Sequence, residues 1–125
     1  MRIPVTTLND GYDFPLLGLG TYKLRGDEAE RVVRTAIELG YRHIDTATLY
    51  ENEVEVGKAI NAAIAAGDVT REELFVTTKL ANDDQHRPAE AYQESLRRLD
   101  LEFIDLYLVH WPMPQRGTYA VSYTH

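Results

Sequence analysis

The chain has 125 residues, of which 44% are hydrophobic and 26% are charged, and it contains no cysteine. This is enough apolar material for one modest hydrophobic core, so the length predicts a single domain. The net charge of −7, from 20 acidic and 13 basic residues, argues against partners such as nucleic acid and anionic membranes, which require clustered Lys and Arg. The composition therefore favours small-molecule chemistry.

Cysteine usage and the amino terminus also bound the function. Without cysteine there is no disulfide framework, no thiolate metal site and no Cys nucleophile, and we predict no metal site. The sequence starts MRIPV without the apolar core of a signal peptide, and no later apolar run is long enough to cross a bilayer. We expect a soluble, cytoplasmic protein.

The first predicted elements are a β-hairpin and one strand-helix unit. Residues 3–8 and 12–15 read as two short strands that turn on Asp10-Gly11, and residues 16–20 read as a separate apolar strand. Asp27, with Glu30 three residues later, predicts the capping box of a helix that ends at Gly40. The apolar stripe of this helix comprises Ala29, Val32, Val33, Ala36 and Ile37.

The same strand-helix pattern then repeats. Residues 41–45 predict a second strand, and residues 53–66 predict a helix that stops at Gly67. The stripe of this helix comprises Val56, Ala59, Ile60, Ala63 and Ile64. Thr70 with Glu73 predicts a capping box for one short turn before a third strand at residues 74–79.

The last predicted unit begins at Pro88, a residue favoured in the first turn of a helix. A helix follows at residues 89–99, and its predicted inner face comprises Tyr92, Ser95, Leu96 and Leu99. Residues 103–109 form the fourth predicted strand, whereas residues 115–125 show no periodic pattern and read as an irregular tail. The fourth strand therefore leaves an open, apolar sheet edge in the predicted pattern.

The spacing of the strand ends predicts a parallel α/β sheet. The strands end at Gly20, Asp45, Lys79 and His110, with separations of 25, 34 and 31 residues, which is the length of one strand-helix-strand step. Right-handed crossovers bring the carboxyl ends of such strands to one edge, where barrels of this kind carry their chemistry. We therefore interpret the polar residues at these ends, together with Tyr50, as a candidate active site.

The residue types suggest proton delivery to a carbonyl oxygen. Tyrosine has an unperturbed pKa of about 10, so a catalytic Tyr50 requires a nearby cation, for which Lys79 is the candidate. Asp45 could balance the buried ammonium, and His110 could hydrogen-bond the substrate oxygen. Three of the residues alone have a structural alternative: Asp45 a turn cap, Tyr50 a packing residue, and His110 a histidine bonded to a backbone carbonyl. Lys79 is more informative, because a lysine that ends an apolar strand is unusual unless it is paired or solvated. The functional interpretation depends on all four occurring together.

Five motifs in order resemble the aldo-keto reductase family from about residue 3 to residue 114, with most similarity to its bacterial 2,5-diketogluconate reductase branch. The motifs are GLGTY (18–22), GYRHIDTA (40–47), YENE (50–53), ELFVTTKL (73–80) and DLYLVHWP (105–112). The resemblance implies a (β/α)8 TIM barrel, of which residues 1–114 would be the amino-terminal half and residues 115–125 the tail. It also implies reduction of aldehydes and ketones with NADPH.

The resemblance assigns roles to individual positions. Tyr50 would be the general acid, supported by Asp45, Lys79 and His110. The cofactor would meet Gly20, Thr21, Tyr22 and Asp45, and the substrate pocket would include Tyr22, Leu49 and Trp111. No position matches the family's later cofactor contacts, and eight units would need about 250 residues.

Two functional hypotheses follow. The first is a carbonyl reductase by family, with the isolated chain truncated and weakly active or inactive. The second is a non-catalytic half-barrel that folds by pairing with another half, as a homodimer or by complementing a fragment. A phosphate-binding barrel of the isomerase type is disfavoured, because the sequence has no glycine-rich phosphate loop.

Overall fold

The computed structural model describes residues 5–7, 13–15 and 18–109. The strands are β1 (Val5–Thr7), β2 (Asp13–Pro15), β3 (Gly18–Gly20), β4 (His43–Asp45), β5 (Phe75–Leu80) and β6 (Leu106–Val109). The α-helices are α1 (Gly26–Glu38), α2 (Glu53–Ala65) and α3 (Pro88–Leu99), and three short 3-10 helices are η1 (Thr48–Tyr50), η2 (Arg71–Glu73) and η3 (Asn82–Asp84). The order of hairpin, strands and helices agrees with the prediction, whereas the predicted tail lies outside the described residues.

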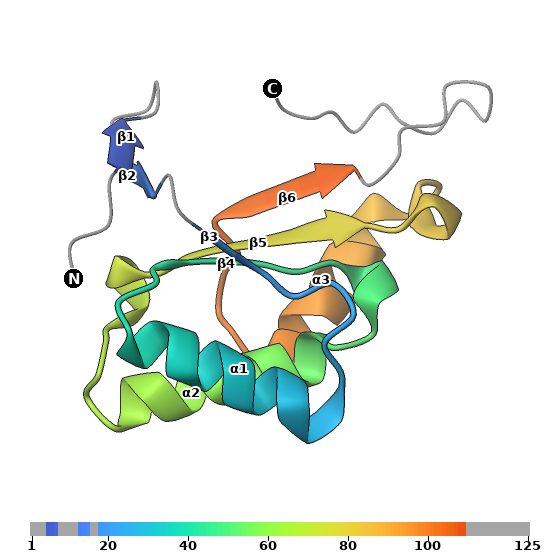
Figure 1. The fold of residues 1–125 in the computed structure, drawn as a ribbon. Coiled ribbons are helices and arrows are strands. Elements are labelled where there is room, and N and C mark those ends of the chain that lie inside the picture. The colour runs from blue at the N-terminus through green and yellow to red at the C-terminus, as the bar shows by residue number, and fades with distance from the viewer. Residues whose placement is uncertain (1–4, 8–12, 16–17, 110–125) are drawn as a thin grey trace.

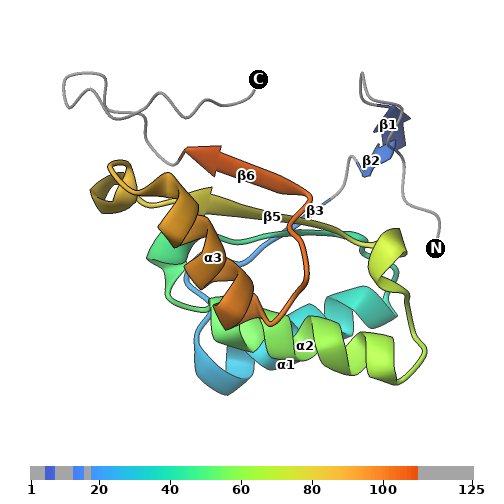
Figure 2. The same ribbon diagram turned by 180° about the vertical axis from the view of Figure 1, so that it is seen from behind.

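The strands form two sheets. β1 and β2 pair antiparallel, and β3, β4, β5 and β6 form a parallel sheet in that order. In Figure 1 all three α-helices lie on one side of the parallel sheet, and the reverse view in Figure 2 shows the same layering. The arrangement confirms the predicted parallel strands with crossover helices.

The hydrophobic core lies between this sheet and the helices. Ile44 of β4 and Val76 of β5 are fully buried and face the helices, because alternate residues of a strand point to opposite faces of a sheet. They pack against Val33, Ile37, Val56, Ala59, Ile60, Ala63, Val69, Leu74 and Leu99. The strand residues on either side of them are thereby directed to the face that carries the candidate site.

The ends of two helices follow the glycine prediction. Gly40 and Gly67 have φ angles of 109° and 82°, which glycine adopts without a steric penalty. The N–H groups of Gly40 and Tyr41 bind back to the carbonyls of Ile37 and Ala36, which closes α1 with a Schellman motif. These bonds turn the chain sharply into β4.

The start of α1 differs from the prediction. The N-cap is Arg25, and no side chain caps the helix, so the predicted Asp27–Glu30 capping box is wrong. The helix begins earlier because the Arg25 carbonyl already accepts a hydrogen bond from the N–H of Ala29. Asp27 instead lies in the first turn, where a negative charge interacts favourably with the helix dipole.

The predicted capping box before β5 is confirmed. The backbone N–H of Thr70 donates to Glu73 Oε1 at 2.8 Å, and the Thr70 side chain binds the Glu73 backbone in return. The Thr70 N–H, followed by the Thr70 hydroxyl, lowers the pKa of Glu73 from its ordinary value. These bonds stabilise the short helix η2, which ends two residues before β5 begins.

Strand β6 begins at Leu106, three residues later than predicted. The Asp105 carboxylate accepts the Val76 N–H at 2.8 Å and pairs with Arg71, whose guanidinium also binds the Phe103 carbonyl. The Asp105 N–H does donate to the Val76 carbonyl at 3.0 Å, but the Val76 N–H is bound by the Asp105 carboxylate and not by a backbone carbonyl, so regular strand pairing starts only at Leu106. Within the described residues, no helix is both long and apolar enough to cross a membrane.

Candidate active site

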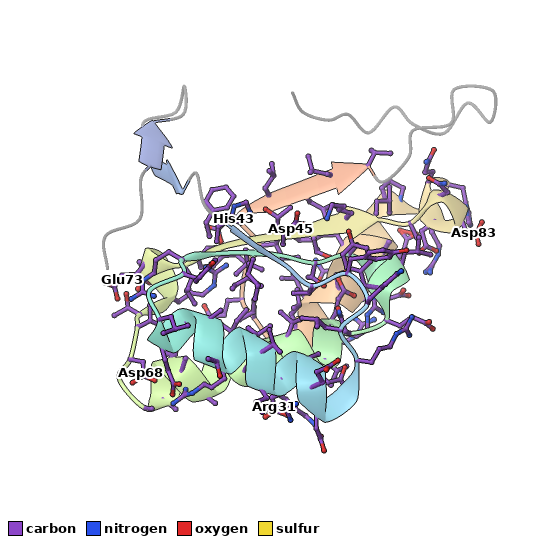
Figure 3. All side chains as sticks on the ribbon, in the orientation of Figure 1. Arg31, His43, Asp45, Asp68, Glu73 and Asp83 are labelled. Atoms are coloured by element: carbon purple, nitrogen blue, oxygen red, sulfur yellow. The ribbon has the colours of Figure 1, made fainter. Side chains whose placement is uncertain are left out.

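The candidate site is built on neighbouring parallel strands. The register pairs Asp45, the last residue of β4, with Thr77 of β5. Lys79 lies two residues beyond Thr77, so it shares the face of Thr77 and Asp45. In Figure 3, Glu73 lies just before β5 and Asp83 just beyond it, which marks the two ends of the strand.

Lys79 is the centre of the cluster. Its ammonium forms an ion pair with Asp45 and donates to the Thr46 carbonyl at 3.0 Å and to the Tyr50 hydroxyl at 3.4 Å. The Lys79 side chain is 14% exposed, whereas that of Asp45 is 40% exposed, so solvent weakens the pair's attraction only in part. The fold therefore brings together three of the four predicted catalytic residues, which are separated by up to 34 positions in the chain.

The position of Tyr50 is set by a short turn. Tyr50 ends η1, and the next residue, Glu51, has a left-handed backbone with φ of 58°. The Lys79 ammonium also lies 5.1 Å from the centre of the Tyr50 ring, close enough for a cation–π interaction. A cation this close to a phenol hydroxyl stabilises the negative charge that develops when the phenol gives up its proton.

The loop after β3 borders this phenol. Tyr22 is 65% exposed, and its ring centre lies 5.3 Å from that of Tyr50. Thr21 is fully buried, and both its N–H and its hydroxyl donate to the Asp45 carbonyl, at 3.0 and 3.1 Å. Gly20 ends β3, and a Cβ placed there would meet no atom of the described residues within 4 Å. The two bonds from Thr21 therefore attach the loop to the end of β4, and the next residue, Tyr22, exposes its ring to solvent.

Of the remaining predicted site residues, Leu49 lies in the described part of the chain, whereas His110 and Trp111 do not. Leu49 precedes Tyr50 in η1 and is 57% exposed. His110 and Trp111 lie outside the described residues, although β6 ends at Val109, in register with Leu80 at the end of β5. In the described part of the chain, no group of three or more His, Cys, Asp or Glu residues could hold a metal ion.

Two buried polar side chains near the site were missed by sequence reasoning. Asn52 is fully buried and binds the carbonyls of Thr21 and Leu24. Glu53 is 2% exposed and binds Arg98 and Thr78. The only sequence signal was the polar run directly after Tyr50, and a polar run between a strand and a helix normally indicates a solvated loop.

The parallel sheet and its strand-end cluster of Asp45, Tyr50 and Lys79 define an α/β protein with the architecture of a partial barrel. A comparison with family models is more specific: residues 16–120 match the aldo/keto reductase family. The chain belongs to this family.

The relatives and solved structures agree with this assignment. The chain is 56% identical over 116 residues to methylglyoxal reductase DkgA of Salmonella typhimurium, covering 93% of this chain and 41% of that protein. It is 47% identical over 110 residues to an NADP-dependent D-sorbitol-6-phosphate dehydrogenase of Malus domestica, covering 88% and 36%. A structure of a Bombyx mori aldo-keto reductase in complex with NADP matches with a TM-score of 0.83 and 49% identity, covering 90% and 39%.

The chain thus spans about two fifths of the length of the relatives it matches. The similarity to the Bombyx mori structure confirms the predicted fold class, part of an aldo-keto reductase (β/α)8 barrel. The four described parallel strands correspond to half of such a barrel.

Proposed function

We propose that the chain carries the proton-donating half of an NADPH-dependent reductase of aldehydes and ketones. The observation that supports this most is the contact of one ammonium, that of Lys79, with both the Asp45 carboxylate and the Tyr50 hydroxyl. The family assignment and the NADP bound to the Bombyx mori relative support the choice of reaction and cofactor.

In this proposal Tyr50 donates its hydroxyl proton to the carbonyl oxygen of the substrate. The Lys79 ammonium, 3.4 Å from the hydroxyl, stabilises the negative charge that forms on the Tyr50 oxygen. Asp45 and the Thr46 carbonyl fix the position of the ammonium. His110 is proposed to orient the carbonyl oxygen towards Tyr50.

The proposed cofactor contacts are Gly20, Thr21, Tyr22 and Asp45. Among the described residues the space beside Gly20 is open, and this space and the exposed Tyr22 ring suit the approach of a flat nicotinamide ring. The single hydroxyl proton of Thr21 is already given to the Asp45 carbonyl, so Thr21 would act mainly by holding the loop. When bound, NADPH supplies the hydride to the carbonyl carbon.

The proposed substrate pocket combines Tyr22, Leu49 and Trp111. The high exposure of Tyr22, whose ring contacts that of Tyr50, and of Leu49, which precedes Tyr50 in η1, supports their use as apolar walls. Because the chain covers 39% of the NADP-bound relative, we propose that the 125-residue chain alone turns over weakly or not at all. We also propose a cytoplasmic protein, and the acidic charge of −7 argues against nucleic acid and anionic membranes as partners.

The test is NADPH binding and turnover by the purified chain. NADPH binding is measured by quenching of its fluorescence, and turnover is measured as NADPH oxidation with methylglyoxal as the probe substrate. We expect detectable binding and at most slow turnover, and any turnover should fall about 100-fold or more in Tyr50→Phe, which removes the proton donor. Tyr92→Phe on α3, where the ring contacts Tyr107, is the control and should keep the wild-type rate. Absence of any NADPH binding would contradict the proposal for this chain.

A second candidate is a half-barrel that associates through β6, most simply as a homodimer. Among the described residues β6 pairs only with β5, and all its residues are half-buried. Beside it lies a groove of about 310 Å³, lined by Leu80, Pro88, Ala89, Tyr92, Gln93, Tyr107, Leu108 and Val109. An edge strand beside an apolar groove favours pairing with another chain.

Sedimentation velocity tests this second candidate. We expect a concentration-dependent dimer that Leu108→Lys weakens, because the substitution places a charge in the apolar groove. Val54→Lys, at a 40% exposed site on α2, is the matched control and should leave association unchanged. A well-folded monomer at all concentrations would exclude association as the route to folding.

A further inference from the structure

The side chain of Asn52 occupies an unusual position next to the candidate site. Asn52 is the N-cap of α2, where an Asn side chain normally binds the free N–H groups of the first turn. Here the side chain makes no such bond, although it is fully buried. Because the Asn52 side chain does not cap α2, its amide is available to bind groups outside this helix.

The Asn52 amide instead binds the loop after β3. Its nitrogen donates to the carbonyls of Thr21 at 2.8 Å and Leu24 at 3.0 Å, and its oxygen accepts from the Thr46 hydroxyl at 2.8 Å. A single side chain thus joins this loop, the end of β4 and the start of α2. Both N–H groups and the oxygen of the amide are used, which a residue other than Asn or Gln could not do.

The two carbonyls that Asn52 binds lie on either side of a tight turn. The N–H of Leu24 closes this turn on the Thr21 carbonyl at 3.0 Å, and Lys23 within it has a left-handed φ of 69°. A non-glycine residue in this conformation is strained and persists only where its surroundings hold it. Tyr22, the ring that lies 5.3 Å from Tyr50, is carried by the same turn.

The Thr46 bond links the amide to the proton-donating cluster. The Thr46 hydroxyl binds Asn52, and the Thr46 carbonyl accepts from the Lys79 ammonium at 3.0 Å. Asn52 also follows Tyr50 by only two residues. The amide is therefore connected, through one or two hydrogen bonds, both to the turn that carries Tyr22 and to the segment that carries Tyr50.

We propose that Asn52 is a positioning residue that holds the Tyr22 turn against Tyr50 and so keeps the two rings in contact beside the proton-donating cluster. Asn52 contacts neither reacting atom in this arrangement and acts through Tyr22 and Tyr50. The consequence for carbonyl substrates depends on the proposed function, but the positioning itself does not. The test below therefore uses no cofactor and no turnover.

The experiment compares the wild-type chain with Asn52→Asp by NMR. The carboxylate has the same size as the amide but cannot donate to the Thr21 and Leu24 carbonyls, and it can cap α2 instead. We expect loss of the nuclear Overhauser contact between the Tyr22 and Tyr50 rings. We also expect the amide hydrogen of Leu24 to exchange about tenfold faster or more, while amides in the middle of α2 keep their rates.

Asn61→Asp is the matched control. The Asn61 amide also donates to two backbone carbonyls, of Leu99 at 3.4 Å and Asp100 at 3.0 Å, but it does so between α2 and α3. This variant should leave the Tyr22–Tyr50 contact and the Leu24 exchange rate unchanged. If Asn52→Asp does not fold, Thr46→Val, which removes only the bond to the Asn52 oxygen, should weaken the same ring contact.

Two results would overturn the proposal. The first is an unchanged ring contact and an unchanged Leu24 exchange rate in Asn52→Asp, or in Thr46→Val where the former does not fold. The second is faster exchange to the same extent throughout α1, α2 and β5, since Asn52 would then support the whole fold and not the turn. In both cases the conclusion holds whether or not the chain reduces carbonyls.

Discussion

At the scale of single residues, β5 is held from both of its faces by one short segment of chain. Lys79 and Thr78 are adjacent and therefore point to opposite faces of the sheet. Lys79 meets Tyr50 on one face, and the Thr78 hydroxyl donates to Glu53 at 2.6 Å on the other. Because Tyr50 and Glu53 are only three positions apart, the contacts of Glu53 help to fix where Tyr50 lies.

Glu53→Gln tests the energetic weight of this second contact. Glu53 has a fully buried side chain that also accepts from Arg98 at 2.7 Å, so the substitution leaves Arg98 without its counter-charge. Removing one partner of a buried pair is costly, and with Arg98 36% exposed we expect a loss of about 2 kcal/mol in the free energy of unfolding. Urea denaturation measures this loss.

The control for this substitution is Glu94→Gln. Glu94 also pairs with an arginine, Arg87, at 2.8 Å, but both side chains are about one third exposed. Solvent screens such a pair, so this variant should lose clearly less stability than Glu53→Gln. Equal losses of stability in the two variants would mean that burial does not make the Glu53–Arg98 pair more stabilising than the more exposed Arg87–Glu94 pair.

Tyr107 predicts a dependence of stability on alkaline pH. Burial, followed by the nearby Glu53 and Asp84 carboxylates, raises the pKa of Tyr107 above its ordinary value of 10.0. The folded state therefore keeps the phenol proton where the unfolded chain has lost it, and stability falls as the pH rises above about 10. Tyr107→Phe removes this dependence, so its stability relative to wild type should increase between pH 9 and pH 11.

Urea titrations of both proteins at each pH measure this difference. Comparing the two proteins cancels the titration of the Lys side chains, which the variants share. Tyr41→Phe, at another half-buried tyrosine, is the control substitution. A constant stability difference between wild type and Tyr107→Phe across the pH range would contradict the prediction.

At the scale of secondary-structure elements, α2 packs tightly against the end of α3 at Gly57. Gly57 lies in α2, and a Cβ placed on it would lie 2.1 Å from the carbonyl oxygen of Leu99, the last residue of α3. The chain there can move only by shifting a whole helix, because the opposing atom is backbone. A glycine in the middle of α2 is thus required by packing, although it lowers helix propensity.

Gly57→Ala should therefore destabilise the protein. Helix propensity alone predicts a gain of up to about 1 kcal/mol, whereas the clash predicts a loss of about 2 kcal/mol or more in the free energy of unfolding. Thermal or urea denaturation gives the sign. Ala62→Gly at an exposed position of the same helix calibrates propensity and should cost about 1 kcal/mol. A stabilised Gly57→Ala would show that the helices separate easily.

The elements also show where local sequence rules succeed and fail. Gly67 and Pro88 marked a helix end and a helix start correctly, because their effects depend only on their own backbone. The start of α1 was predicted wrongly, since the turn before it is held by Asn52, 28 positions beyond Leu24. The start of β6 was also wrong, because Arg71 and Asp105 are paired across 34 positions.

At the scale of the whole molecule, the burial of strand residues in the core differs between the central and the outer strands of the parallel sheet. The central strands β4 and β5 supply its fully buried residues Ile44 and Val76, whereas all four residues of β6 are only half-buried. Within the described chain β3 and β6 each pair with a single neighbour. The two outer strands should therefore open more easily than the central ones.

Native-state hydrogen exchange tests this gradient. We expect hydrogen-bonded amides of β4 and β5 to exchange about tenfold more slowly, or slower still, than those of β3 and β6, after correction for intrinsic rates. Amides in the middle of α2, which packs on the same core, are the internal reference and should follow β4 and β5. Uniform protection of all four strands would mean that the outer strands are covered, as in an associated half-barrel.

The sequence by itself determined the type and order of the elements, the parallel sheet and the edge at which Asp45 and Lys79 meet. These follow from local periodicity, from glycine and proline signals and from the regular spacing of strand ends, all of which can be read along the chain. The tertiary structure alone decided that Asn52 holds the Tyr22 turn and that Glu53 is buried against Arg98, 45 positions away. Such pairs depend on which side chains the packed helices bring within hydrogen-bonding distance, and no local pattern encodes that distance.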